Sequence, residues 1–365
     1  MGNIIDYVKW RGDLTFAVDP FNEVDNLIFS YLSYVNLDGV APIEGEELLT
    51  ITEISEKFFA MHSEEELQKD KSFIRLAPDM LKEMAGTRRY GDLLAGNYLN
   101  HINIEENLQF SAIEIVLPDE SSYLAIRGTD DRIVGWKEDF LMASGEVAAQ
   151  TEAVEYVNRC GKNRPRIRIG GHSKGGHLAV YAGAFCETEV QNRIVKVYNN
   201  DGPGFRKDFL ESKELANIVR RIVRIVPEHS IVGMLLGHVT TPIVIQSNAV
   251  GVMQHDGLSW QVLGPRFETV PELSKTAVIL DQSMDQWLQN YNDEERNHFI
   301  NDFFSVLEAP GVETLTELQN GGVKALAAMW KRRETLAPET KEKIDLLLQT
   351  ILMHWTDFVP DFLKK

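Results

Sequence analysis

The residue best suited to nucleophilic chemistry lies in the stretch Gly170 to Gly176, which reads Gly-Gly-His-Ser-Lys-Gly-Gly. Ser173 stands there between Gly171 and Gly175 in a G-x-S-x-G pattern, in which glycines remove the Cβ atoms that would clash in a tight strand-to-helix turn. A helix that begins at such a turn directs free N–H groups toward the serine hydroxyl. The pattern also fits an ordinary glycine-rich turn, so the flanking sequence has to decide.

The flanks favour the chemical interpretation. Ile167 and Ile169 alternate with arginines before the turn, which is the period-2 pattern of a short strand. The run from Leu178 to Phe185 is apolar and rich in small residues, as in a packed helix. Ser173 is therefore predicted at a strand-to-helix corner, as a nucleophile.

A serine hydroxyl becomes nucleophilic when a histidine takes its proton, and in α/β-hydrolases the order along the chain is serine, acid, histidine. His255 lies in a predicted turn between two strand-like runs downstream of Ser173, and we expect it to be the base. The other histidines are less suitable: His172 and His177 are fixed by the turn itself, His298 lies in a helical region, and His229 and His238 are the remaining downstream candidates.

Two residues are candidates for the acid, and the sequence leaves both open. Glu228 follows the predicted strand Ile222 to Val226, and Asp201 follows the preceding strand in an Asn-Asn-Asp-Gly-Pro-Gly loop. Each also has a structural interpretation, a solvated strand end for Glu228 and an Asx turn for Asp201. The backbone N–H groups of Thr129 and Lys174 are the predicted oxyanion donors, although Gly-Thr also suits a plain turn with a helix cap.

The elements that position these residues alternate between strands and helices, which predicts an α/β fold with a mostly parallel sheet and a site at the carboxyl ends of its strands. Residues 1–85 are expected to form a helical N-terminal cover, 86–265 the core and 266–365 a C-terminal helical extension. Within the core we expect a helix containing Leu93, Leu94 and Tyr98, a hairpin from Ile113 to Ile126, a helix from Arg206 to Val219, and strands at Ile243 to Gln246 and Leu258 to Leu263. Three apolar helical faces are expected in the extension, represented by Leu280 with Trp287, Phe299 with Phe303, and Leu346 with Trp355.

The composition narrows the class of partner. The 365 residues include 37 basic and 55 acidic side chains, a net charge of −18, which argues against nucleic acid or an anionic membrane surface as a partner. Two cysteines without C-x-x-C spacing, and the lack of a secretory or membrane-spanning apolar run, lead us to expect a cytoplasmic protein. The sequence shows no metal-ligand cluster, P-loop or dinucleotide motif, so no metal and no cofactor are expected. The C-terminal helices are candidates for an oligomer contact.

Three segments resemble the lipase class 3 group of α/β-hydrolases: Ile126-Arg127-Gly128-Thr129 followed by Trp136 and Asp139, the turn around Ser173, and His255-Asp256-Gly257 followed by Trp260. The Lys174 position, the Asp201-Gly202-Pro203-Gly204-Phe205 loop and the Ser230-Ile231-Val232-Gly233 run look more closely like a bacterial domain family of unknown function within that group. The resemblance implies an α/β-hydrolase core with nucleophile Ser173, base His255 and an oxyanion contact from Thr129.

The sequence departs from that group at two places. Lipases of the class usually carry Leu where Lys174 stands, and Ser230 occupies the position at which their acid is expected. We expect Lys174 to place a charge at the mouth of the site, which would suit an anionic or polar acyl substrate. The resulting hypothesis is a serine hydrolase for a small-molecule ester or thioester; the alternative is a catalytically silent hydrolase-like fold that serves as a binding module.

Overall fold

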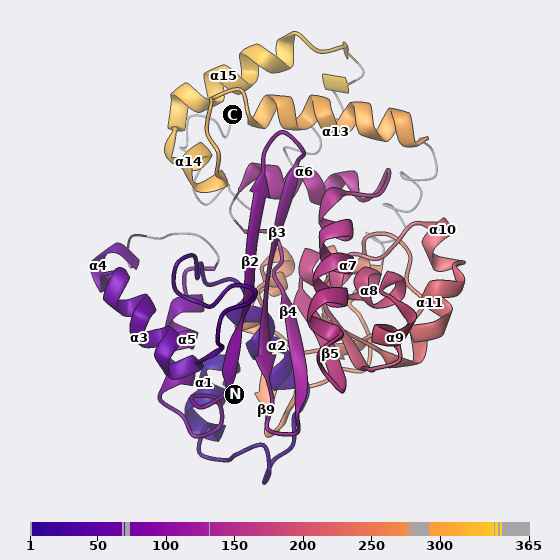
Figure 1. Ribbon diagram of the computed structural model, residues 1–365. Coiled ribbons are helices and arrows are strands. Elements are labelled where there is room, and N and C mark those ends of the chain that lie inside the picture. Colours follow the sequence, from indigo (N-terminus) through magenta and orange to yellow (C-terminus); the bar gives the residue numbers. More distant parts are fainter. Residues whose placement is uncertain are drawn as a thin grey trace.

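The computed structural model of the chain is built around an eight-stranded sheet (Figure 1). It describes residues 2–67, 69, 74–130, 132–275, 277–278, 292–338, 340–341 and 344. The strands lie in the sheet in their order along the chain, which is β1 (Leu49–Thr50), β2 (Leu94–Asn103), β3 (Leu108–Val116), β4 (Ser121–Ile126), β5 (Arg166–His172), β6 (Ile194–Asn200), β7 (Ile222–Pro227) and β8 (Ile243–Ile245).

Strand direction divides the sheet into two parts. The strands β1 to β4 are antiparallel, whereas β4 to β8 are all parallel. Crossovers between parallel strands are right-handed, so successive strands added on the same side place their helices on a single face. The helices α7 (Ala148–Gly161), α8 (Lys174–Phe185) and α11 (Lys213–Ile218) cover that face (Figure 1). The predicted α/β fold with a mostly parallel sheet is confirmed.

The other face of the sheet needs a cover from outside the crossovers, and the N-terminal helices provide it. The helices there are α1 (Ile4–Arg11), α2 (Glu23–Leu32), α3 (Ile51–Met61), the short α4 (Glu64–Leu67) and α5 (Ala77–Ala85). Of these, α2 lies directly against β4 and β5. Alternation along β3 serves both layers: Ile113 and Ile115 enter the N-terminal core, while Phe110 and Ala112 enter the core under α7 and α8.

A third cluster joins the C-terminal helices to the core through α6 (Ile133–Leu141). Its helices are α13 (Asp293–Leu307), α14 (Leu315–Asn320) and α15 (Gly322–Glu334), at the top of Figure 1. The ring of Phe140 on α6 lies 6.0 Å from that of Phe303 and 5.5 Å from that of Phe304. The predicted face with Phe299 and Phe303 therefore packs as expected, while the faces predicted at Leu280 with Trp287 and at Leu346 with Trp355 fall outside the described residues.

Several sequence-based expectations of local structure can be compared directly. The hairpin is confirmed as β3 and β4, and the strand at Ile243 as β8. The helix expected around Leu94 and Tyr98 is wrong, because these residues belong to β2. A bulge between Gly96 and Leu99, with Asn97 at φ 47°, breaks the strand alternation and leaves an apolar spacing typical of a helix.

Two further elements are shorter than expected. The helix expected from Arg206 to Val219 is split into α10 (Lys207–Leu210) and α11, with Ser212 capping the second. Of the strand expected from Leu258 to Leu263, only β9 (Val262–Leu263) forms, pairing with β10 (Arg266–Phe267) after a 3₁₀ turn at Gly257–Ser259.

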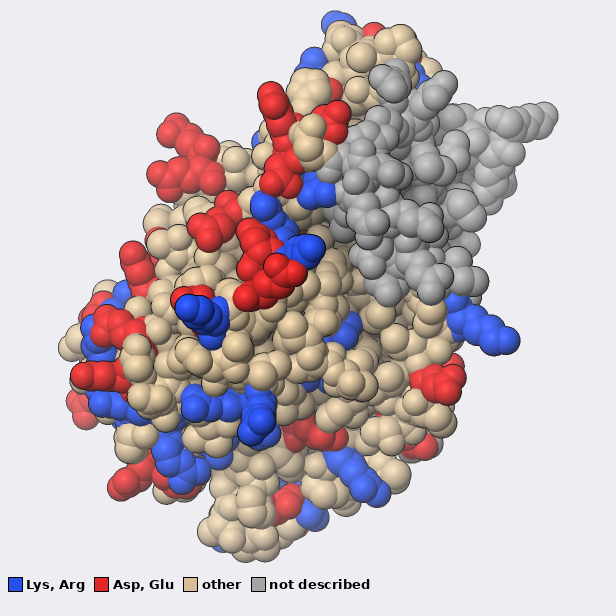
Figure 2. Space-filling model, turned by 90° about the vertical axis from the view of Figure 1, so that its right-hand side faces the viewer, with Lys and Arg blue, Asp and Glu red and all other residues tan. Residues whose placement is uncertain are grey.

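Charged side chains are common on the surface, and the basic ones do not form a single large patch on the face shown in Figure 2. On the face shown in Figure 2, Lys and Arg side chains stand in small groups beside Asp and Glu side chains. In the ranges given above, no helix combines the length and apolarity needed to cross a bilayer.

Candidate active site

Ser173 occupies a strained corner between β5 and α8. Its backbone has φ 57° and ψ −133°, a combination that residues with a side chain rarely adopt and that a rigid surrounding has to hold in place. A Cβ on Gly175 would lie 2.1 Å from the carbonyl oxygen of Ile126, and one on Gly171 would lie 2.3 Å from the backbone of Gly175. Neither neighbour is a flexible side chain. The corner is thus built from close backbone contacts that require glycine on both sides of the serine.

Three side chains from distant parts of the chain meet at this corner. Nε2 of His255 lies 3.0 Å from Oγ of Ser173, and Nδ1 of the same ring lies 2.7 Å from Oδ2 of Asp201. Ser173 follows β5, Asp201 follows β6, and His255 lies in the loop after β8, so all three come from the carboxyl-terminal edge of the parallel strands. A carboxylate can only accept, so Nδ1 carries the proton and the lone pair of Nε2 faces the serine hydroxyl. That is the protonation pattern of a general base.

Asp201 is fully buried and both of its carboxylate oxygens are used. Oδ2 accepts from His255, and Oδ1 accepts from the hydroxyl of Ser230. The backbone of Asp201 is itself in the left-handed region at φ 53°, and its N–H donates to the carbonyl of Ile225 on β7 at 2.8 Å. Aspartate tolerates this conformation better than most residues. The carboxylate is therefore fixed by the end of the neighbouring strand.

Of the two acids proposed from the sequence, Asp201 is bound to His255 and Glu228 is not. Glu228 follows β7, where its N–H donates to the carbonyl of Ile245, and the Nδ1 atom of His255 is already bound to Asp201. The other candidate histidines lie elsewhere: His229 faces Gln254, and His298 on α13 faces Asp302. The structure thus brings together Ser173, His255 and Asp201.

The loop that carries His255 is fastened to two other elements. Nε2 of His172 donates to the carbonyl oxygen of His255 at 2.7 Å, which leaves Nδ1 of His172 to accept from the hydroxyl of Tyr34 at 3.0 Å. Tyr31, also from the α2 segment, donates to Asp256 at 2.9 Å and accepts from the N–H of Gly257 at 2.6 Å. Burial, followed by the nearby His255, lowers the pKa of His172 well below its usual value, which keeps this ring neutral.

These positioning contacts are not among the predictions made from the sequence. Tyr31 lies among the buried apolar side chains of α2, where an aromatic residue indicates core packing rather than a hydroxyl in use. The available signal was a pair of tyrosines spaced three apart, Tyr31 and Tyr34, in a buried helical segment. Buried hydroxyls need polar partners, so the pair indicates that a polar site lies against the end of this helix.

The two segments that carry the proposed oxyanion donors lie beside Ser173. Gly128 lies two residues after the end of β4, directly before Thr129. A Cβ on Gly128 would lie 2.4 Å from the carbonyl oxygen of His172 and 3.1 Å from Cβ of Ser173. Thr129 is buried, and its hydroxyl donates to Oδ2 of Asp139 at 2.6 Å. Lys174 is the first residue of α8, where backbone N–H groups have no partner within the helix. Both segments therefore border the space around the Ser173 hydroxyl.

Comparison with known proteins shows the family to which the chain belongs. The Mbeg1-like family model matches residues 84–305, which is more than half of the chain and includes Ser173, Asp201 and His255. The chain belongs to the Mbeg1-like family. No curated protein matches it. Among solved structures it is similar to a crystal structure of M37 lipase, with 15% identity and a TM-score of 0.34 over 57% of this chain and 68% of the lipase. The relation to the lipase class 3 group, suggested by the motifs, stays a prediction.

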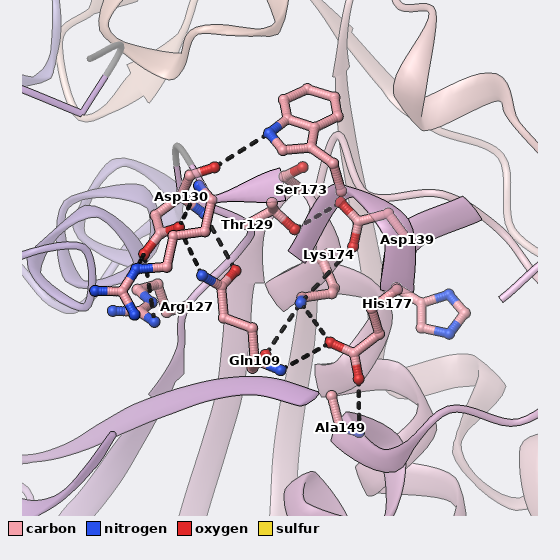
Figure 3. A network of polar contacts seen from close by, with 12 residues as sticks. Gln109, Arg127, Thr129, Asp130, Asp139, Ala149, Ser173, Lys174 and His177 are labelled. Carbon is pink, nitrogen blue, oxygen red and sulfur yellow. Dashed lines mark hydrogen bonds and ion pairs between the residues drawn. The ribbon is translucent and has the colours of Figure 1, made fainter. Parts of the chain in front are cut away.

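In this Mbeg1-like chain the side chain of Lys174 does not lie at the mouth of the site, so that expectation is wrong. Lys174 is 1% exposed, and its ammonium donates to Glu138 on α6 at 2.9 Å and to the carbonyl of Gln109 at 3.0 Å. Figure 3 shows the side chain of Lys174 extending from the start of α8 toward Gln109 and Asp139. The side chain thus reaches α6 and β3, and its charge is enclosed between them.

A second carboxyl group, that of Asp139, lies beside Thr129 and Lys174 in this Mbeg1-like chain. Its Oδ2 atom accepts from Thr129, and Oδ1 lies 3.8 Å from the Lys174 ammonium. Burial raises the pKa of Asp139 to about 6, against opposing effects of Lys174 and of the Thr129 hydroxyl. This carboxyl therefore changes charge closer to neutral pH than an ordinary aspartate does.

Proposed function

We propose that this protein is a serine hydrolase that cleaves a carboxylic ester or thioester through an acyl-enzyme, with Ser173 as nucleophile, His255 as base and Asp201 as the orienting acid. The observation that carries the proposal is the continuous hydrogen-bond chain from Ser173 through His255 to Asp201, at 3.0 and 2.7 Å. Each member of the chain has the chemical type and protonation that its role requires.

The acylation step follows from this geometry. Oγ of Ser173 attacks the acyl carbon while its proton moves to Nε2 of His255, and the Asp201 carboxylate stabilises the imidazolium that forms. The N–H groups of Thr129 and Lys174 stabilise the charge on the former carbonyl oxygen. When the tetrahedral intermediate collapses, Nε2 returns its proton to the departing alcohol or thiol.

Deacylation repeats the sequence with water in place of the serine. His255 takes a proton from water as its oxygen attacks the acyl carbon, and then returns the proton to Oγ of Ser173 as the carboxylic acid leaves. These steps use side chains and backbone N–H groups of this chain together with one water molecule. A small-molecule acyl compound is the substrate class that we propose. The enclosed position of the Lys174 ammonium removes the argument for an anionic substrate.

A fluorophosphonate probe tests the proposal without knowledge of the natural substrate, because it reacts with activated serine hydroxyls. Wild-type protein, Ser173→Ala and His255→Ala are treated in parallel, and the label is followed by gel fluorescence and peptide mapping. We expect labelling of wild-type protein on Ser173 and none in either variant. If folded wild-type protein stays unlabelled, the binding-module alternative replaces the proposal.

A further inference from the structure

A buried ion-pair cluster lies next to the proposed oxyanion hole and has no part in the proton transfers. It consists of Lys174 on α8 and the adjacent acids Glu138 and Asp139 on α6, and Figure 3 shows Lys174 and Asp139 reaching toward one another. Lys174 and Glu138 are each at most 1% exposed. Burying an ammonium among packed side chains is unfavourable unless charges and hydrogen bonds compensate, so the arrangement calls for an explanation.

The carboxylate of Glu138 is sufficient to neutralise the charge of the Lys174 ammonium. Its Oε2 atom accepts from the Lys174 ammonium and from the N–H of Gln109 at 3.1 Å, and its Oε1 atom accepts from the N–H of Ala149 at 3.0 Å. Glu138 is therefore held by three donors. One ammonium paired with this carboxylate would make a closed neutral unit without Asp139.

Asp139 differs, since one of its oxygens depends on Lys174. Oδ2 accepts from Thr129, whereas Oδ1 is buried and makes no hydrogen bond among the described residues. The Lys174 ammonium, at 3.8 Å, is the cation that faces this oxygen. The cluster therefore links the two segments that supply the oxyanion donors: Lys174 belongs to one, and Asp139 holds the hydroxyl of Thr129 in the other.

We propose that Lys174 is a positioning residue for the oxyanion hole: its buried ammonium binds the acidic pair of α6 and so fixes the Thr129 segment that Asp139 holds. The inference rests on the proposed function, because an oxyanion hole has meaning only if Ser173 is acylated. A misplaced donor stabilises the transition state less, while binding of the substrate changes little.

The charges around Asp139 predict how loss of Lys174 would appear. The groups that face it are Lys174 from α8, Glu138 from its own helix, the Thr129 hydroxyl and His255 from the loop after β8. Burial and Glu138 raise the pKa of Asp139, while Lys174 lowers it. Without the ammonium the pKa must rise above about 6, and Asp139 then becomes neutral at a higher pH than in the wild type.

The experiment compares Lys174→Met with Arg164→Met, a matched variant at the opposite end of β5. Arg164 pairs with Glu114 at 2.6 Å, and Glu114 is 1% exposed, so this variant also leaves a buried glutamate without its cation. The turnover of a p-nitrophenyl ester is measured from pH 5 to pH 9, together with thermal unfolding. For Lys174→Met we expect kcat to fall by about 10- to 100-fold at pH 7 with a KM within about threefold, and to recover partly at high pH. For Arg164→Met we expect lower stability and an unchanged pH profile.

Asp139→Asn provides a second variant in case Lys174→Met does not fold, because it keeps the Lys174 pair with Glu138. It should lower kcat similarly and show no recovery at high pH. A folded Lys174→Met protein with wild-type kcat and pH profile, or an Asp139→Asn protein with wild-type kcat, would overturn the inference.

A readout without substrate separates this inference from the proposed function. The carboxyl carbon of Asp139 can be titrated by NMR in protein labelled at aspartate, with its signal assigned by its loss in Asp139→Asn. We expect a midpoint near 6 in wild-type protein and a higher one in Lys174→Met. An unchanged midpoint refutes the coupling even if the enzyme is active, whereas an inactive wild-type protein with the expected shift refutes the proposed function alone.

Discussion

The hydroxyl of Ser230 donates a hydrogen bond to Oδ1 of Asp201, the carboxylate oxygen that His255 does not use. Ser230 follows β7, at the position where the sequence resemblance places the acid of a lipase, and Asp201 follows β6. In this chain the carboxylate thus comes from one strand earlier, and a hydroxyl at the later position binds its free oxygen. Both residues are buried, so the pair orients the carboxylate toward His255.

Replacing the acid tests this arrangement. Asp201→Asn should reduce the rate of Ser173 acylation by about 10³- to 10⁴-fold, because the amide favours the wrong tautomer of His255 and does not stabilise the imidazolium. The measurement is the second-order rate constant for fluorophosphonate labelling. Glu228→Gln is the matched control and should stay close to wild type. Equal losses in the two variants would show that Asp201 has no special role.

The backbone contacts around the nucleophile predict a large effect of a single methyl group. In Gly175→Ala the new Cβ would lie 2.1 Å from the Ile126 carbonyl oxygen. Ile126 is paired in the sheet and Gly175 lies in the first turn of α8, so relief of the clash has to shift a strand or a helix. We expect a loss of more than about 4 kcal/mol in the free energy of unfolding, measured by urea denaturation. Gly145→Ala, where the nearest atom is 4.0 Å away on Arg206, should change it by less than about 0.5 kcal/mol. Similar values for the two variants would contradict the described corner.

Removing the Tyr31 hydroxyl should affect the base loop more than the fold. Tyr31→Phe leaves the N–H of Gly257 without its acceptor, a cost of about 1–3 kcal/mol, and frees the loop that carries His255. We expect the acylation rate to fall by about tenfold or more. Tyr7→Phe is the control, since the buried Tyr7 hydroxyl accepts from Asn22 on the N-terminal cover. If both variants lose stability and neither loses rate, Tyr31 has only a packing role.

Buried neutral histidine makes stability depend on pH. Burial lowers the pKa of His177 from 6.5 to about 4, so between these values the unfolded chain binds a proton that the folded chain does not. The free energy of unfolding should therefore fall as the pH drops from 6.5 toward 4, with up to about 1.4 kcal/mol per pH unit from this residue. His177→Gln should reduce that slope accordingly in urea denaturation at pH 7, 6 and 5. An unchanged slope would show that His177 does not contribute.

Local patterns in the sequence were sufficient for some of the site and not for the rest. Ser173 and the Thr129 segment lie in short motifs whose glycines specify their own turns, and these positions could be predicted. The choice between Asp201 and Glu228 could not, because both follow neighbouring strands at the same edge of the sheet, and the decision depends on where the loop after β8 delivers His255.

The direction of the Lys174 side chain is another non-local property. Its partners Glu138 and Gln109 come from α6 and β3. The sequence around Lys174 does not indicate which distant residues its side chain contacts. The strand β2, where the sequence predicts a helix, is a related case. A bulge in β2 interrupts the alternation of its apolar residues, so the sequence lacks the usual strand pattern. The pairing with β3 shows that the segment is extended.

The reaction of the protein with a p-nitrophenyl ester in a rapid-mixing experiment tests the central claim most directly. We predict a burst of nitrophenolate stoichiometric with the protein, and an acyl group on the peptide that contains Ser173, both absent in Ser173→Ala. A slow release without a burst, an acyl group on another residue, or equal behaviour of Ser173→Ala would contradict the proposal that Ser173 is the nucleophile of this chain.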